Sequence, residues 1–100
     1  MGADIIQTQP TAVEMYETWL NSKEAEINTY FNKNIVRLLE EHWETKGGPH
    51  FTITMKSFSL AERDILRQCF IDAGFTINSL VCGLNSTSVS GNIYYYTVKS

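Results

Sequence analysis

The sequence contains two histidines and two cysteines that could bind a metal ion: His42, His50, Cys69 and Cys82. Zinc sites are usually assembled from cysteine and histidine pairs at close spacing, and no pair among these four has that spacing. His42 falls near the end of an expected helix, where an imidazole can cap free carbonyl groups. We therefore predict no metal site and no cofactor, and a structural role for His42.

Thiol catalysis would require one of the cysteines to lie beside a histidine. Cys69 falls within an apolar helical stripe, where burial raises a thiol's pKa and weakens it as a nucleophile. Cys82 lies on an expected strand whose facing is ambiguous. The sequence contains no glycine-rich phosphate loop and no GxSxG or HExxH motif. We predict that the protein has no catalytic residues and is not an enzyme.

Three consecutive tyrosines, residues 94–96, suggest a stacking surface for bases. Tyr94 and Tyr96 share one face of an expected strand, and Lys56 and Lys99 are the basic residues that could flank them. Exposed aromatic rings with neighbouring bases bind single-stranded nucleic acid. The chain, however, carries 11 acidic against 8 basic residues, a net charge of −3, and no RNP-like segment. Single-stranded nucleic-acid binding is therefore the alternative function.

The element with the strongest helix signals covers residues 59–75. Ser59 and Glu62 form a capping box, in which each side chain bonds the other residue's backbone N–H. Gly74 can adopt the left-handed conformation that closes a helix. Apolar residues recur between these ends at three- and four-residue steps and predict one buried stripe. The stripe consists of Ile65, Leu66, Cys69, Phe70 and Ala73.

Residues 11–46 predict a helical arm. Thr11 and Glu14 form a second capping box at its start. Asn21 followed by Glu24 resembles a further cap, so we expect either one helix kinked near Asn21 or two helices. The apolar stripe of the arm contains Val13, Tyr16, Leu20, Ile27, Phe31, Ile35 and Leu38.

Three strands are expected after the arm ends at the Gly–Gly–Pro sequence. Residues 50–58 alternate apolar and polar side chains, which is typical of a half-buried strand. Residues 76–84 predict a second strand, with a bulge near Asn78 and Ser79 that would reconcile its facing. Residues 85–91 read as a polar loop. Residues 93–98, IYYYTV, are apolar or aromatic on both sides and predict the third strand.

These elements predict an α+β fold in a single domain of 100 residues, with 43% apolar residues to fill one core. We expect a mobile leader over residues 1–10, the helical arm over 11–46 and a βαββ core over 49–99. A strand that is apolar on both faces belongs in the centre, so the three-stranded mixed sheet has the order 1-3-2, with strands 1 and 2 parallel and strand 3 antiparallel to both. The arm could cover the second sheet face, extend the same helical layer, or serve a partner.

The N-terminal sequence MGADIIQTQP has no basic segment followed by a long apolar run, and no stretch of the chain reaches the length of a membrane span. We therefore expect no membrane association and a cytoplasmic location. Two cysteines without redox spacing agree with this expectation.

The arm carries more large aromatic side chains than one small domain would be expected to hide. Interface cores are enriched in aromatic residues and methionine. We predict a non-enzymatic interaction or regulatory module, inhibitor-like or adaptor-like, that acts through the arm. Its partner would in the first place be a second copy, in a homodimer, and in the second place a heterologous target; small accessory proteins of phages are of this kind. The alternative that the arm buries these residues within its own domain stays open. The predicted partner-binding residues are Tyr16, Trp19, Tyr30, Trp43, Leu60 and Ile71.

Overall fold

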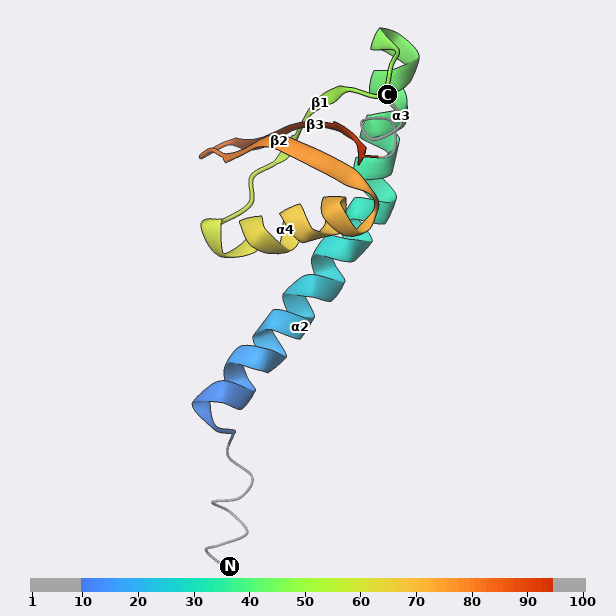
Figure 1. The fold of residues 1–100 in the computed structure, drawn as a ribbon. Coiled ribbons are helices and arrows are strands. Elements are labelled where there is room, and N and C mark those ends of the chain that lie inside the picture. The colour runs from blue at the N-terminus through green and yellow to red at the C-terminus, as the bar shows by residue number, and fades with distance from the viewer. Residues whose placement is uncertain (1–9, 95–100) are drawn as a thin grey trace, which may run out of the picture.

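The computed structural model describes residues 10–94 of the chain. One long helix runs along the molecule, and a sheet and a further helix pack against its C-terminal half (Figure 1). The α+β class is therefore confirmed. In chain order the elements are α2 (Ala12–Tyr30), η1 (Phe31–Ile35), α3 (Val36–Lys46), β1 (Phe51–Lys56), α4 (Leu60–Asp72), β2 (Phe75–Cys82) and β3 (Ser86–Ile93).

The first three elements form one continuous helix. It begins at the predicted capping box: Glu14 N donates to Thr11 Oγ1 at 3.1 Å, and Thr11 N donates to Glu14 Oε1 at 2.9 Å. The kink or break predicted near Asn21 is wrong, because α2 continues through this point. An established helix extends at little cost, and Ile27 beyond Asn21 is buried in the core and holds the helix in place. Gly47, with φ 75°, ends the helix.

The segment η1 is a wide π-helical turn within this helix. Its signature is the bond from Val36 N to the carbonyl of Phe31, five residues earlier. Ile27, Phe31, Ile35 and Leu39 follow one another at four-residue steps, and all four are buried. In a regular α-helix three such steps would rotate the side chains by about 120° in total. The wider turn reduces this drift, which keeps these side chains directed at the same core.

The sheet has the predicted order, β1-β3-β2. Strand β3 is antiparallel to both neighbours, so the sheet is antiparallel throughout. The predicted description as mixed is wrong in this detail, because β1 and β2 run in the same direction without being paired. The predicted bulge in β2 is confirmed by a shift of register between Ile77 and Ser79.

The central strand is not the one that the sequence predicted. Strand β3 covers residues 86–93, most of which were expected to form a polar loop. Of the predicted strand 93–98, only Ile93 belongs to β3; Tyr94 follows it, and residues 95–98 lie outside the described part. Small residues suit this position because Phe51 packs directly over Gly91, where a Cβ would lie 3.1 Å from the ring's Cζ. Thr87 is fully buried but accepts a bond from Phe58 N at 2.9 Å.

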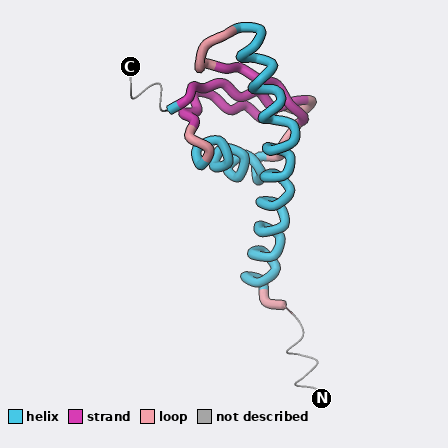
Figure 2. The backbone as a smooth tube through the Cα atoms, turned by 90° about the vertical axis from the view of Figure 1, so that its right-hand side faces the viewer, coloured by secondary structure: helices cyan, strands magenta, loops and turns pink. Residues whose placement is uncertain are grey.

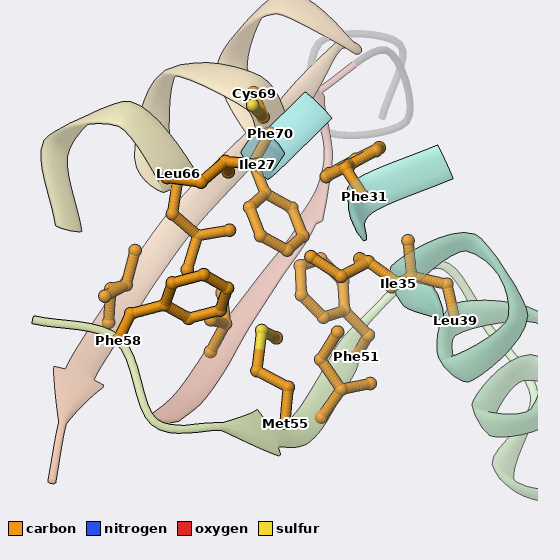
Figure 3. Packing of buried hydrophobic residues seen from close by; sticks show 13 residues of the cluster. Ile27, Phe31, Ile35, Leu39, Phe51, Met55, Phe58, Leu66, Cys69 and Phe70 are labelled. Atoms are coloured by element: carbon orange, nitrogen blue, oxygen red, sulfur yellow. The ribbon is translucent and has the colours of Figure 1, made fainter. Parts of the chain in front are cut away.

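Both the long helix and α4 cover the same face of the sheet. Figure 3 shows Phe31, Ile35 and Leu39 of the long helix directed toward Phe51 and Phe70. The arm therefore extends the helical layer formed by α4, which was one of the three predicted arrangements. The buried cluster consists of Ile27, Phe31, Ile35, Leu39, Phe51, Ile53, Met55, Phe58, Leu66, Cys69, Phe70, Leu80 and Val89.

The opposite face of the sheet carries mainly small polar side chains, with the exposed Val81 of β2 among them. In β1 the residues that alternate with the buried ones, Thr52, Thr54 and Lys56, are exposed. Their register partners in β3 are Ser90, Ser88 and Ser86. No described helix packs on this face (Figure 2), so the sheet presents hydroxyl groups rather than aromatic rings on its outer side.

Candidate protein-interaction surfaces

The residues that could bind a metal or act as nucleophiles do not form an assembled site. Within residues 10–94, no group of three or more histidine, cysteine, aspartate or glutamate side chains could hold a metal ion. Cys69 is buried, and its Sγ donates to Asn28 Oδ1 at 3.4 Å. Burial, and to a smaller extent the nearby carboxylates of Asp72 and Glu24, raises the pKa of the Cys69 thiol. The predicted core position of Cys69 is confirmed, and its thiol stays protonated at neutral pH.

The other three candidates for such chemistry lie on separate elements. Cys82 is half-buried at the end of β2, and His50 is exposed just before β1. His42 is half-buried on α3, where it lines an open groove beside β1.

The N-terminal part of α2 projects from the domain (Figures 1 and 2). We call residues 12–22 the projecting arm. Every one of them is exposed except the half-buried Leu20. Tyr16 is 59% exposed and Trp19 is 38% exposed, and their rings stack on each other with centroids 6.0 Å apart. Met15 and Val13 are more than half exposed. The projecting arm therefore presents four large apolar side chains to solvent.

Val13 and Tyr16 continue the stripe that packs the core, whereas Trp19 and Met15 lie about 80–120° to one side of it around the helix. At 100° per residue, Tyr16 and Leu20 lie on the same side of α2 as the buried Ile27. The side of α2 that packs on the domain C-terminal to Lys23 therefore remains apolar N-terminal to Lys23, where the helix projects from the domain. The cap at Thr11 and extension from a packed helix account for helical structure in a segment that buries little surface.

Lys23 marks where the domain ends along α2. Its Nζ lies 3.3 Å from Glu26 Oε1 and 3.3 Å from Glu62 Oε2 on α4. Glu26, followed by Glu62, raises the pKa of Lys23. The pKa of Glu62 is lowered, first by the backbone N–H of Ser59 and then by Lys23. This ion pair ties the long helix to the N-terminal turn of α4.

The six predicted partner-binding residues occupy different environments. Tyr16 and Trp19 are exposed on the projecting arm, whereas Tyr30 and Trp43 pack within the domain. Tyr30 meets Phe58 edge-on with centroids 5.4 Å apart, and Trp43 stacks on Phe75 at 6.3 Å.

The remaining two, Leu60 and Ile71, are exposed on α4. At 100° per residue they lie about 80–140° around the helix from the buried Leu66 and Phe70. Within the described chain, the structure thus leaves two of the four predicted arm residues free for a partner.

The alternative nucleic-acid face is not assembled by the described residues. Lys56 pairs with Ser86 at one end of β3, whereas Tyr94 follows its other end. Eight residues of strand separate these ends, about 27 Å at roughly 3.4 Å per residue. The Lys56 ammonium instead lies 5.0 Å from the centre of the Tyr30 ring. The other two predicted residues of this face, Tyr96 and Lys99, lie outside the described residues.

A groove between α3 and β1 was not predicted from the sequence. It has a volume of about 280 Å³ and is lined by Leu38, Glu41, His42, Thr45 and Lys46 of α3 and by Thr52, Ile53 and Thr54 of β1. The signal that could have revealed it was the predicted strand order, which makes β1 an edge strand.

No known protein family, curated protein or solved structure matches the chain. In the described part of the chain, no helix combines the length and apolar character needed to cross a membrane.

Proposed function

We propose that the protein is a non-enzymatic interaction module whose projecting arm docks into an apolar groove of a partner protein. The observation that carries this proposal is the uncovered continuation of the core stripe at Tyr16, with the Trp19 ring stacked beside it. A buried aromatic or aliphatic side chain of this size contributes roughly 1.5–3 kcal/mol. A groove that covered the stripe would therefore gain enough from it for specific binding, as in other helix-in-groove complexes.

The charges beside the stripe favour a particular kind of partner. Residues 12–26 contain four glutamates and one lysine, and that lysine, Lys23, is already paired with Glu26 and Glu62. Two arms packed against each other would bring carboxylates together, which disfavours association. A groove with lysine or arginine at its rim would complement them. We therefore assign the projecting arm to a heterologous partner with a basic rim, and treat pairing of two arms as the competing outcome.

Affinity capture with matched baits tests this assignment. The baits are the wild-type chain, a Tyr16→Ala/Trp19→Ala double variant, and Leu84→Ser as a control. Leu84 is 98% exposed and lies away from the arm. Its replacement therefore controls for the loss of an exposed apolar side chain that does not belong to the arm. Because the arm residues bury little surface within the domain, the free energy of unfolding of the double variant should lie within about 0.5 kcal/mol of the wild-type value.

The expected result is a protein captured by the wild type and by Leu84→Ser but lost with the double variant. Its binding, remeasured with purified components, should weaken as salt increases because rim charges contribute. Identical captures by all three baits would contradict docking through the arm. If the purified double variant had a lower molar mass than both the wild type and Leu84→Ser, the arms of two copies would be shown to pair with each other.

A further inference from the structure

Strand β1 has an open edge. Ser86 accepts a bond from Gly83 N at 2.8 Å, so the main-chain groups of Ser86 point toward β2. Main-chain direction alternates along an antiparallel strand, so the groups of Thr87, Val89 and Gly91 point toward β1. Their partners in β1 are Met55, Ile53 and Phe51. The N–H and C=O groups of Thr52 and Thr54 therefore point outward, away from β3.

The hydrogen bond at the end of β1 agrees with this direction. Lys56 follows the same alternation, and its outward N–H donates to the Tyr30 hydroxyl at 3.4 Å. Tyr30 thus closes one end of the edge.

The two edges of the sheet differ in how they are protected. The edge strand β2 is interrupted by its bulge, which is a common way to prevent pairing with another chain. Strand β1 is regular and contains no proline, and its outward groups at Thr52 and Thr54 have no bonding partner among residues 10–94. An edge of this kind is suited to accept another strand.

The charges of the groove beside this edge occur in a self-complementary order. Residues 47–50 turn the chain back, so that β1 runs away from the C-terminal end of α3 at an oblique angle (Figure 1). Lys46 accordingly lies toward Thr52, and Glu41 lies toward Thr54. Five residues of helix span about 7.5 Å and two residues of strand about 6.8 Å, so the two pairs of positions are matched in length. Neither Lys46 nor Glu41 has an ion pair within the described chain.

We infer that two copies of the chain pair through their β1 edges, antiparallel and symmetric about Ile53. Thr52 of each copy then lies opposite Thr54 of the other, so that their outward main-chain groups bond and their side chains form threonine pairs on the outer face. Lys46 of each copy faces Glu41 of the other. The result is a continuous six-stranded antiparallel sheet with an isologous interface.

A second copy fits this edge better than an unrelated strand because both the main-chain groups and the charges match under a twofold rotation. This interface does not involve the projecting arm. The two arms remain free, and a dimer would offer a partner two docking segments.

Light scattering after size exclusion tests the dimer. The wild type should have a molar mass of 22.8 kDa, which is twice the 11.4 kDa of one chain. Thr54→Pro removes an outward N–H, a change that an edge strand tolerates within its own fold, and should give the mass of one chain. The Tyr16→Ala/Trp19→Ala variant should keep the mass of the dimer, which separates this interface from the arm.

Charge reversal keeps the test valid even if Thr54→Pro does not fold. Lys46→Glu and Glu41→Lys alone should each raise the dissociation constant about tenfold, because each replaces two attractive pairs by repulsive ones. The combined variant should restore dimerisation. If the wild type had the molar mass of a single chain at concentrations up to about 100 μM, the inference would be overturned. A dimer with a dissociation constant above that concentration would be too weak for a specific interface. A combined variant that dimerises no better than the single variants would also overturn it.

Discussion

Replacing Gly91 by alanine should destabilise the domain strongly. An added Cβ would collide with the Thr76 carbonyl oxygen in β2 and lie 3.1 Å from Phe51 Cζ. The Phe51 ring cannot move aside easily, because it stacks on Phe70 at 5.8 Å and meets Phe75 at 5.4 Å. Overpacking typically costs 1–3 kcal/mol, and here one of the opposing atoms is backbone. We therefore expect a loss of about 3 kcal/mol in the free energy of unfolding.

Urea unfolding followed by tryptophan fluorescence measures this loss, with Trp43 as the reporter because it stacks on Phe75 at the margin of the core. Ser90→Ala is the matched control: it changes the neighbouring residue of β3, which faces the outer side of the sheet. The free energy of unfolding of this control should lie within about 0.5 kcal/mol of the wild-type value.

A Gly91→Ala variant as stable as the control would refute the placement of residues 86–93 between β1 and β2. It would favour the arrangement predicted from the sequence, in which residues 93–98 form the central strand and residue 91 belongs to a loop. The variant thus distinguishes two assignments of the same strand order.

Two further predictions concern groups whose pKa is shifted. The pKa of Glu62 is lowered by the Ser59 N–H and by Lys23, so the stability it contributes is present at neutral pH and is lost as the pH falls below about 4. Glu62→Gln should therefore cost about 1 kcal/mol at pH 7 and much less at pH 3 in urea unfolding; an equal cost at both values would show that the charge does not matter. Cys69 should react with a thiol reagent only on unfolding, because burial raises its pKa, whereas the half-buried Cys82 should react faster. Equal reaction rates of Cys69→Ser and Cys82→Ser variants would contradict this assignment.

The central strand shows why part of the fold could not be predicted. Residues 93–98 have much higher strand propensity than residues 86–91, and propensity measures how well side chains pack on a pleated surface. In β3 the deciding factor is instead the bulk of the neighbours: Phe51 lies over Gly91, and the small residues of β3 leave room for such rings. That requirement comes from another strand, some forty residues away in sequence.

The candidate interaction surfaces were predictable only in part. The apolar stripe through Tyr16 and Leu20 is visible in the sequence, but an apolar stripe has the same pattern whether it is covered or exposed. Tyr30 and Trp43 were predicted on the same grounds as Tyr16 and Trp19, and the structure packs them against Phe58 and Phe75. The two pairs differ in their position along the long helix: Tyr30 and Trp43 lie where the helix packs on the domain, whereas Tyr16 and Trp19 lie on the part that projects beyond α4.

By itself the sequence determined the ends of the helices and the alternation of β1. The predicted strand order is found as well, although it was predicted from residues 93–98, of which only Ile93 belongs to β3. The capping boxes at Thr11 and Ser59 involve partners three residues away, and the helix end at Gly74 needs a local conformation that glycine allows. Only the tertiary structure decided which residues form β3, where the long helix widens at η1, and which part of its stripe is uncovered. These features depend on burial against elements distant in sequence, and burial is a property of the packed chain, whereas hydrogen bonds within one helical turn are a property of neighbouring residues.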